Sequence, residues 1–400
     1  MDMDPKAVAT THPNQRSILD VPAASFTTAR VVFLDALRFI AAAAVLLQHS
    51  IEHQGRLGTK IVSTLSPGVF GVVLFFIVSG FVIPMSVRGD LDLKKFAIRR
   101  IFRIYPLLIF TFVVLYFGSS SGIFYDFAKI QTASLRDWIA NVLLVQDYVG
   151  ARPLWGVTWT LSLEAAWYVL FALSMLHLGR HFDEWLSIAA PTGMITLGIL
   201  SIFIAHRLPL ARIGMVYAAI LGCRIYRGYV GEVTVKRLNL DIGVFIAVMA
   251  FCNVISFGHF RHPNITMNEA VFPWIVAPLF FLMFSNVPRV RQSVFVNNPF
   301  VCRLGAISFS TYLLHPFGLV IAESLLPAGL SLVFGTFLSL IFSIVAYRLV
   351  EKPGQALGER VTGAVSGVRS EPARPSQFGF HSVSRRRHST GPRSQGRGLR

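Results

Sequence analysis

Long apolar segments recur along this chain, and they limit its possible folds more than any other feature. Crossing the hydrocarbon core of a bilayer takes about 20 helical residues. Ten runs of roughly this length cover residues 31–51, 67–87, 104–118, 158–178, 186–205, 209–226, 240–258, 271–286, 306–323 and 328–349. Lipid offers the backbone no hydrogen-bond partner, so such segments should be helices. We therefore predict an all-α, polytopic integral membrane protein with about ten transmembrane helices.

Composition excludes a soluble protein and a nucleic-acid reader. Hydrophobic residues make up 54% of the 400 residues and charged residues only 14%, whereas globular chains carry about 25% charged residues. The net charge of +17 would suit a nucleic-acid partner, but 34 Phe and a mean hydropathy of +0.59 do not. We expect membrane lipids as partners and no nucleic acid.

The placement of the basic residues indicates the orientation. Cytoplasmic loops of membrane proteins are rich in Lys and Arg. With both termini inside, the inner segments hold 28 of the 37 Lys and Arg, the outer segments hold 8, and Arg38 lies within the first span. Both termini are therefore predicted to be cytoplasmic.

Three regions follow from this topology: a cytoplasmic N-terminal segment (1–30), a transmembrane domain (31–352) and a basic cytoplasmic tail (353–400). Residues 361–400 hold eight Arg and one Glu without apolar periodicity, which predicts disorder. The run 384–388, Ser-Arg-Arg-Arg-His, could bind anionic lipid headgroups. A solvated tail that only reinforces the topology is the alternative.

Four ionisable residues within the spans need an explanation, because charge in the bilayer core is costly. They are Asp35, Arg38, His49 and Glu164. Arg38 and His49 are eleven residues apart, so they share a helix face about 16 Å apart along the axis. Asp35 can pair with Arg38 across one turn. A structural ion pair with an interfacial histidine is the plain alternative to a functional site.

Glu164 lies in the predicted outer half of its span, at about the depth of His49. There a carboxylate could hold an imidazole in one tautomer or help to position a hydroxyl acceptor. We therefore count Glu164 among the candidate catalytic residues. His315 lies about halfway down the ninth span, and a buried, hydrogen-bonded structural histidine is the favoured interpretation.

A basic segment precedes the third span, with Arg99, Arg100 and Arg103 within five positions. Arg100 and Arg103 are three residues apart and so present two guanidinium groups on one side of a helix. Planar guanidinium groups bind phosphate oxygens bidentately. Orientation alone explains any one of these arginines, but we expect the three together to bind a phosphate group.

Six short motifs occur in an order that resembles the membrane-bound acyltransferase 3 family. They are Leu-Asp-Ala-Leu-Arg at 34–38 with an Arg-x10-His spacing to His49, Phe-Phe-Ile-Val-Ser-Gly-Phe at 75–81, Arg-Arg-Ile-Phe-Arg-Ile-Tyr-Pro at 99–106, Trp-Thr-Leu-Ser-Leu-Glu at 159–164, Ser-Thr-Tyr-Leu-Leu-His at 310–315 and Tyr-Arg-Leu-Val-Glu-Lys-Pro at 347–353. No single motif is specific, but their order is. The similarity extends from about residue 30 to 360.

The resemblance implies a bacterial inner-membrane enzyme that moves an acyl group, usually acetyl, from cytoplasmic acyl-CoA to a hydroxyl of a surface or exported glycan. It implies that Arg38 and His49 are the functional pair and that Arg100 and Arg103 contact acyl-CoA. Beside it, the residues predict CoA at Arg99, Arg100 and Arg103, and a thioester that reaches His49 past Arg38. No metal is expected.

Two other classes remain open at this stage. A non-enzymatic transporter or flippase could use the same intramembrane charges to line a substrate route. A scaffold with a lipid-binding tail would leave those charges unexplained. His49 could act as a general base or as a transient acyl carrier, and the identity of the acceptor is open.

Overall fold

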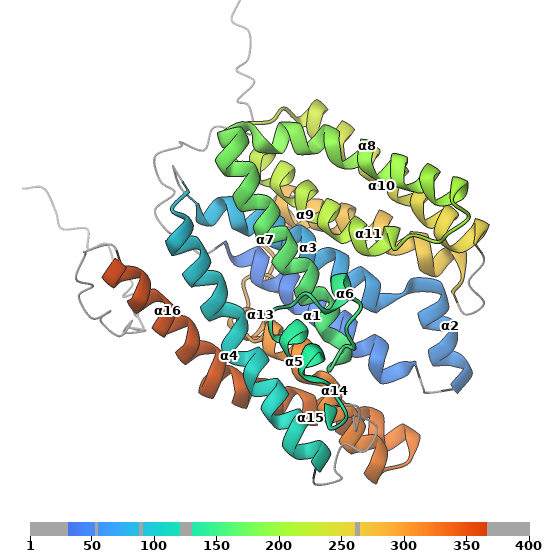
Figure 1. Ribbon diagram of the computed structural model, residues 1–400, viewed down its shortest axis with the longest axis vertical. Coiled ribbons are helices and arrows are strands. Elements are labelled where there is room, and N and C mark those ends of the chain that lie inside the picture. The colour runs from blue at the N-terminus through green and yellow to red at the C-terminus, as the bar shows by residue number, and fades with distance from the viewer. Residues whose placement is uncertain (1–30, 53–54, 88–90, 121–129, 261–264, 366–400) are drawn as a thin grey trace, which may run out of the picture.

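The computed structural model describes residues 31–52, 55–87, 91–120, 130–260 and 265–365, which fold into helices with no strand among them (Figure 1). The helices are α1 (Val32–Ile51), α2 (Gly55–Leu65), α3 (Pro67–Ser86), α4 (Leu93–Ser120), α5 (Leu135–Val142), α6 (Gln146–Val149), α7 (Trp159–Leu178), α8 (Phe182–Phe203), α9 (Leu210–Tyr229), α10 (Val235–Asn253), α11 (Met267–Asn286), α12 (Pro288–Arg291), α13 (Pro299–Ala306), α14 (Ser308–Leu325), α15 (Ala328–Ala346) and α16 (Lys352–Val365). The all-α class is confirmed. The predicted N-terminal segment and the tail from residue 366 onward lie outside the described residues.

Each of the ten predicted spans contains a helix, but the number that meets a strict membrane test is lower. Within the described residues, seven helices are long and apolar enough to cross a membrane, or eight if a bent pair counts as one span. One reason is that α7 and α8 form a single apolar stretch of 48 residues. The other is that α9 contains Arg212, Arg224 and Arg227. The protein is polytopic, and the count of ten is approximate.

Glycines allow the central helices to pack backbone to backbone. In Figure 1, α1 and α3 cross the middle of the molecule, with α8 and α10 along one edge and α4 and α16 along the opposite side. A methyl group added at Gly71 would overlap the Ala41 carbonyl oxygen of α1, and one at Gly80 would overlap the Ala219 carbonyl oxygen of α9. Small residues at helix contacts are the usual device for close packing in membranes.

A sharp bend separates α13 from α14. Their axes differ by 71°. Gly305, at the end of α13, lies against the backbone of Asp35 in α1, where any Cβ would clash. The bend therefore places the first turn of α14 beside α1.

The last helix extends into the range where the sequence predicts a disordered tail. A five-residue π-helical turn, Tyr347–Glu351, joins α15 to α16, which then runs along α4 (Figure 1). Gly354 and Gly358 allow this approach, since a Cβ at either position would crowd Pro106 or Phe102. The pattern of polar residues predicts a tail, whereas these two glycines create a docking face.

A buried ion network joins α8, α9 and α10. Arg224 is only 4% exposed and contacts Asp183 at 2.7 Å and Asp241 at 2.8 Å. Arg227 adds a second contact to Asp183 at 3.1 Å, and Arg237 contacts Asp241 at 3.1 Å. The count of basic residues assigns Arg224 to an inner loop (224–237), although it also falls at the end of the predicted span 209–226. In the structure Arg224 lies within α9 and ties three helices together.

Candidate functional site

A wide cavity of about 710 Å³ opens between α1, α4, α13 and the π-helical turn, and we call it the vestibule. Its basic residues are Arg38, Arg99 and Arg103, and its acidic residues are Asp35 and Glu351. Phosphate binding needs guanidinium groups that face open space. The vestibule provides this at the position where the sequence predicts a phosphate site.

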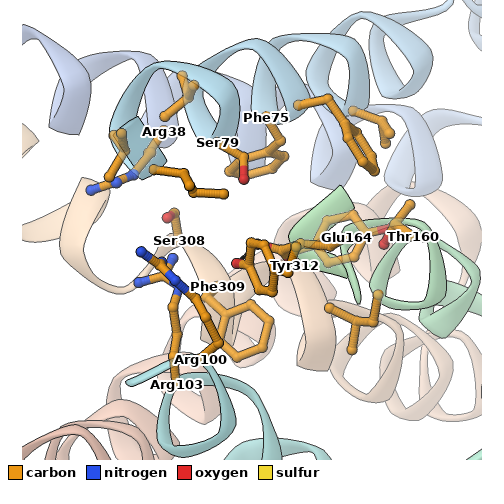
Figure 2. A pocket seen from close by; sticks show the side chains of 17 residues that line it. Arg38, Phe75, Ser79, Arg100, Arg103, Thr160, Glu164, Ser308, Phe309 and Tyr312 are labelled. Atoms are coloured by element: carbon orange, nitrogen blue, oxygen red, sulfur yellow. Dashed lines mark hydrogen bonds between the residues drawn. The ribbon is translucent and has the colours of Figure 1, made fainter. Parts of the chain in front are cut away.

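A second, narrower cavity of about 100 Å³ continues from the vestibule, and we call it the chamber. Both are lined by Arg38, Val82, Arg103, Ser308 and Phe309, so these residues form the neck between them. In Figure 2 the side chains of Arg38, Arg100, Arg103 and Ser308 gather at one end of the chamber and Thr160 lies at the other. The bend between α13 and α14 supplies two of the five neck residues.

The rest of the chamber wall is mainly apolar. Its apolar residues, from α3, α7 and α14, are Val72, Phe75, Phe76, Val78, Val82, Ile83, Leu161, Phe309 and Tyr312. An arrangement with charge at the neck and an apolar interior suits a ligand with an anionic end and an apolar end.

Arg38 lies in both cavities and pairs with Asp35. Its Nη1 is 3.7 Å from Asp35 Oδ1, and the two side chains are 23% and 6% exposed. The predicted pairing across one helical turn is confirmed. At 3.7 Å this ion pair is longer than the contacts of Arg224, and the Arg38 side chain also lines the vestibule.

The three arginines of α4 take different positions. Arg99 is exposed and lines the vestibule, Arg103 lines both cavities, and Arg100 lines the chamber. Arg100 Nη2 donates to Ser86 Oγ at 2.9 Å, and its guanidinium lies over the ring of Tyr168, 5.2 Å from the centroid. Arg100 Nε is buried with no partner among the described residues. The three predicted arginines therefore line one continuous space, but they are distributed between the vestibule and the chamber.

Glu164 lies in the chamber rather than beside His49. The Tyr168 hydroxyl donates to Glu164 Oε1, and Tyr168 in turn lies beneath Arg100. Glu164 and Arg103 also lie close enough to interact electrostatically. Glu164 thus belongs with the arginines of α4, and its role in positioning an acceptor hydroxyl stays a prediction.

Glu351 is a site residue to which the sequence argument gives no role. It is 2% exposed and lines the vestibule. Ser310 Oγ donates to it at 2.5 Å and Gln355 Nε2 at 3.0 Å. An acidic residue at the end of the last span, within the motif at 347–353, is the signal that could have identified it.

Tyr312 and Thr160 close the far end of the chamber. Thr160 Oγ1 donates to the Tyr312 hydroxyl at 2.8 Å, and that hydroxyl donates to the Val157 carbonyl at 3.2 Å. The Tyr312 ring centroid is 6.2 Å from that of His315. Only the Tyr312 ring of the chamber wall is therefore needed to connect the chamber with His315.

His49 lies beyond this end and contributes to neither cavity wall. Its Nδ1 is 2.8 Å from Glu52 Oε1, and its ring stacks on His315 with centroids 5.1 Å apart. His315 is fully buried and bonds to the Tyr312 carbonyl at 2.8 Å. The prediction that His315 is buried and hydrogen-bonded is confirmed, whereas its contact with His49 was not foreseen.

Comparison with known proteins identifies the family of this chain. The model of a family of membrane enzymes described as an acyltransferase domain, acyltransferase 3, matches residues 31–348. The chain therefore belongs to the acyltransferase 3 family. The matched range contains α1, the bend and every residue of the chamber.

Individual relatives match shorter segments. The chain is 30% identical over 155 residues to "Acyltransferase MdmB" of Streptomyces mycarofaciens, which is 36% of this chain and 39% of that protein. It is 27% identical over 154 residues to "O-acetyl transferase" of Shigella phage Sf6, again 36% of this chain and 46% of that one. The chain thus matches less than half of the length of each relative. No solved structure matches significantly.

Proposed function

We propose that the protein is a membrane-bound O-acyltransferase that transfers a short acyl group from cytoplasmic acyl-CoA to a hydroxyl of a surface or exported glycan. Membership of the acyltransferase family supports the reaction class. The phage relative named O-acetyl transferase supports oxygen as the accepting atom and acetyl as the group. Acyl-CoA and the glycan are our assignments, as are a bacterial inner-membrane location and cytoplasmic termini.

The observation that carries the proposal is the joining of an arginine-lined vestibule to an apolar chamber through one neck. CoA combines phosphate groups with a long, neutral arm that ends in the thioester. In our proposal the phosphates lie in the vestibule against Arg38, Arg99 and Arg103. The arm passes the neck and carries the acyl group into the chamber.

The chamber volume favours a small acyl group. At about 100 Å³ the chamber is smaller than the roughly 150 Å³ cavity that accommodates benzene in an engineered protein. An acetyl group fits such a space, and a long fatty acyl chain does not. This argument from size is independent of the relatives' names.

Transfer itself is assigned to His49. As a general base, its imidazole takes the proton of the acceptor hydroxyl while that oxygen attacks the thioester carbonyl. The C–S bond breaks, and the departing thiolate takes up the proton from the imidazolium. A covalent acyl-imidazole formed first and then attacked by the hydroxyl gives the same products. In either route the acyl group must pass from the chamber to His49, whose ring stacks on His315 next to the Tyr312 ring of the chamber wall.

The test uses membranes of a deletion strain complemented with each variant and supplied with acetyl-CoA labelled in the acetyl group. His49→Ala should abolish incorporation of label into glycan, and normal incorporation would overturn the assignment. Arg100→Gln with Arg103→Gln should raise the acetyl-CoA concentration needed for half-maximal transfer. An unchanged requirement would move the donor site elsewhere.

The same membranes identify the acceptor. Mass spectrometry of glycans from the deletion strain should reveal one glycan that lacks an acyl mass, and complementation should restore it. If the wild type consumes no more acetyl-CoA than His49→Ala does, and no glycan changes, the alternative of a transporter is favoured.

A further inference from the structure

The His49 side chain has a carboxylate neighbour on its own helix. Glu52 Oε1 lies 2.8 Å from His49 Nδ1, and the two side chains are 30% and 38% exposed. A carboxylate at this distance accepts a hydrogen bond, so Nδ1 carries the proton of the neutral ring. Nε2 is then the nitrogen with a free lone pair. A single hydrogen bond thus decides which nitrogen can act as base or nucleophile.

A second ring fixes the plane of the His49 imidazole. His315 of α14 stacks on it with centroids 5.1 Å apart and an angle of 25° between the ring planes. His315 is itself held by its hydrogen bond to the Tyr312 carbonyl and is fully buried. Glu52 therefore restrains the edge of the His49 ring while His315 restrains its face. Restraint in both directions is what a group needs when it must meet a reacting atom.

Spacing alone does not make such a pair functional, as the same chain demonstrates. His181 and Glu184 form an equivalent pair three residues apart, with Nδ1 3.3 Å from Oε1. Their side chains are 75% and 63% exposed, and no ring stack on His181 is recorded in the described part of the chain. The pair of His49 and Glu52 differs in its shorter distance, its burial and its contact with a fixed ring.

We propose that Glu52 is the positioning residue of His49, which holds the imidazole in the tautomer that presents Nε2 to the acyl transfer. This inference rests on the proposed function of His49. During transfer Nε2 gains the proton of the acceptor hydroxyl, and the Glu52 carboxylate stabilises the resulting imidazolium through the Nδ1–H bond. The proton then leaves with the CoA thiolate, so Glu52 itself is never protonated.

Two substitutions separate the parts of this role. Glu52→Gln can keep an acceptor for Nδ1–H but removes the negative charge. Glu52→Ala removes both. Positioned bases contribute about 10²- to 10⁴-fold, so we expect Glu52→Ala to lower the maximal transfer rate on the order of 10²-fold. We expect Glu52→Gln to lower it less. Neither change should alter the acetyl-CoA requirement, because the donor cavities lie elsewhere.

The pH profile gives a readout that a merely structural residue would not move. Among the described residues, the titratable groups that contact His49 are Glu52 on its own helix and His315 on α14. Glu52→Gln removes the negative charge beside the Nδ1–H bond, and that charge acts on the imidazolium formed during transfer. The dependence of the transfer rate on pH should therefore differ between Glu52→Gln and the wild type.

The experiment measures incorporation of labelled acetyl into glycan from pH 5 to 8, with total CoA release as a second readout. Glu184→Ala is the matched control and should leave rate and profile unchanged. If His49→Ala abolishes transfer while both Glu52 variants match the wild type in rate and profile, this inference is wrong and the proposed function stands. If His49→Ala retains transfer, the proposed function itself fails. Where Glu52→Ala gives no folded protein, the profile of Glu52→Gln decides.

Discussion

Two regions of the molecule bury charge, and they differ in how completely the charges are paired. Arg224, in α9, contacts two buried carboxylates at 2.7 and 2.8 Å. The arginines that line the chamber differ from it, since Arg100 leaves one buried N–H unpaired among the described residues and Arg38 lies 3.7 Å from its carboxylate. They also face a cavity, whereas Arg224 lines neither the vestibule nor the chamber.

The difference separates structural charge from charge that can bind a ligand. A buried ion is tolerated when partners satisfy it, so the Arg224 network connects helices and has little left to bind. A site for a charged ligand needs donors that protein groups do not already occupy. Incomplete pairing beside open space is therefore the better guide to function than burial alone.

Breaking the Arg224 network should have the largest effect, and the effect should be on stability. Arg224→Leu leaves Asp183 and Asp241 buried with less compensation, which costs about 3–5 kcal/mol. Thermal unfolding in detergent measures this loss. The fraction that remains folded should keep its acetyl-CoA requirement. A variant that unfolds at the wild-type temperature but needs more acetyl-CoA would place Arg224 in the functional site.

At the neck, a substitution should affect activity more than stability. Arg38→Gln removes a charge from both cavities, and we expect kcat/KM for acetyl-CoA to fall about 30- to 150-fold, equivalent to about 2–3 kcal/mol. The double variant Asp35→Asn with Arg38→Gln leaves no unpaired carboxylate behind. It should unfold near the wild-type temperature and remain as impaired as the single variant. Recovery of activity in the double variant would assign Arg38 a structural role.

The chamber should select acyl length. Phe75→Leu shortens a side chain of the apolar wall and so enlarges the chamber. One methylene of a ligand in such a pocket is worth about 1–3 kcal/mol of discrimination between substrates. We expect the ratio of butyryl to acetyl transfer to rise about tenfold, measured by competition between the two CoA esters. Phe70→Leu is the matched control, since Phe70 lies on the same helix outside the chamber wall. An equal change in both variants would contradict acyl binding in the chamber.

The smallest effect should come from a carboxylate outside the spans. Asp137 in α5 has its pKa lowered from its ordinary value of 3.8, first by the Arg152 backbone amide and then by Ser134. A lowered folded-state pKa gives stability that is present above the unfolded value and is lost as pH falls through the folded value. Asp137→Asn should flatten the fall in unfolding temperature below about pH 4 and change little at pH 7. A curve parallel to the wild type would remove this contribution.

Helix placement could be read from the sequence because apolar length is a local property. The same local argument could not show that Arg224 ties helices together, because its partners Asp183 and Asp241 lie on other helices. It also stopped the last helix too early, since Gly354 and Gly358 have meaning only against α4. Contacts between distant segments decided each of these differences.

The residues of the site also divide into those that a local pattern predicts and those that contacts between distant segments bring together. The pair of Asp35 and Arg38 follows from spacing within one helix, and the arginines of α4 follow from their clustering. The partner of His49 is also local, but the sequence argument assigned the role of holding an imidazole to Glu164 rather than to Glu52. The stacking of His49 on His315 and the closure of the chamber by Tyr312 join helices far apart in the chain, so no local pattern could reveal them.

The contact between Gly305 and the backbone of Asp35 has a consequence for how such an enzyme can diversify. The close contact of α13 with α1 beside the neck is made by main-chain atoms, so it does not depend on the identity of the Asp35 side chain. If the chamber binds the acyl group as proposed, wall residues such as Phe75 can be exchanged to suit another acyl group without a change in this contact at the entrance. Gly305 has no such freedom, since any side chain there would force the two helices apart.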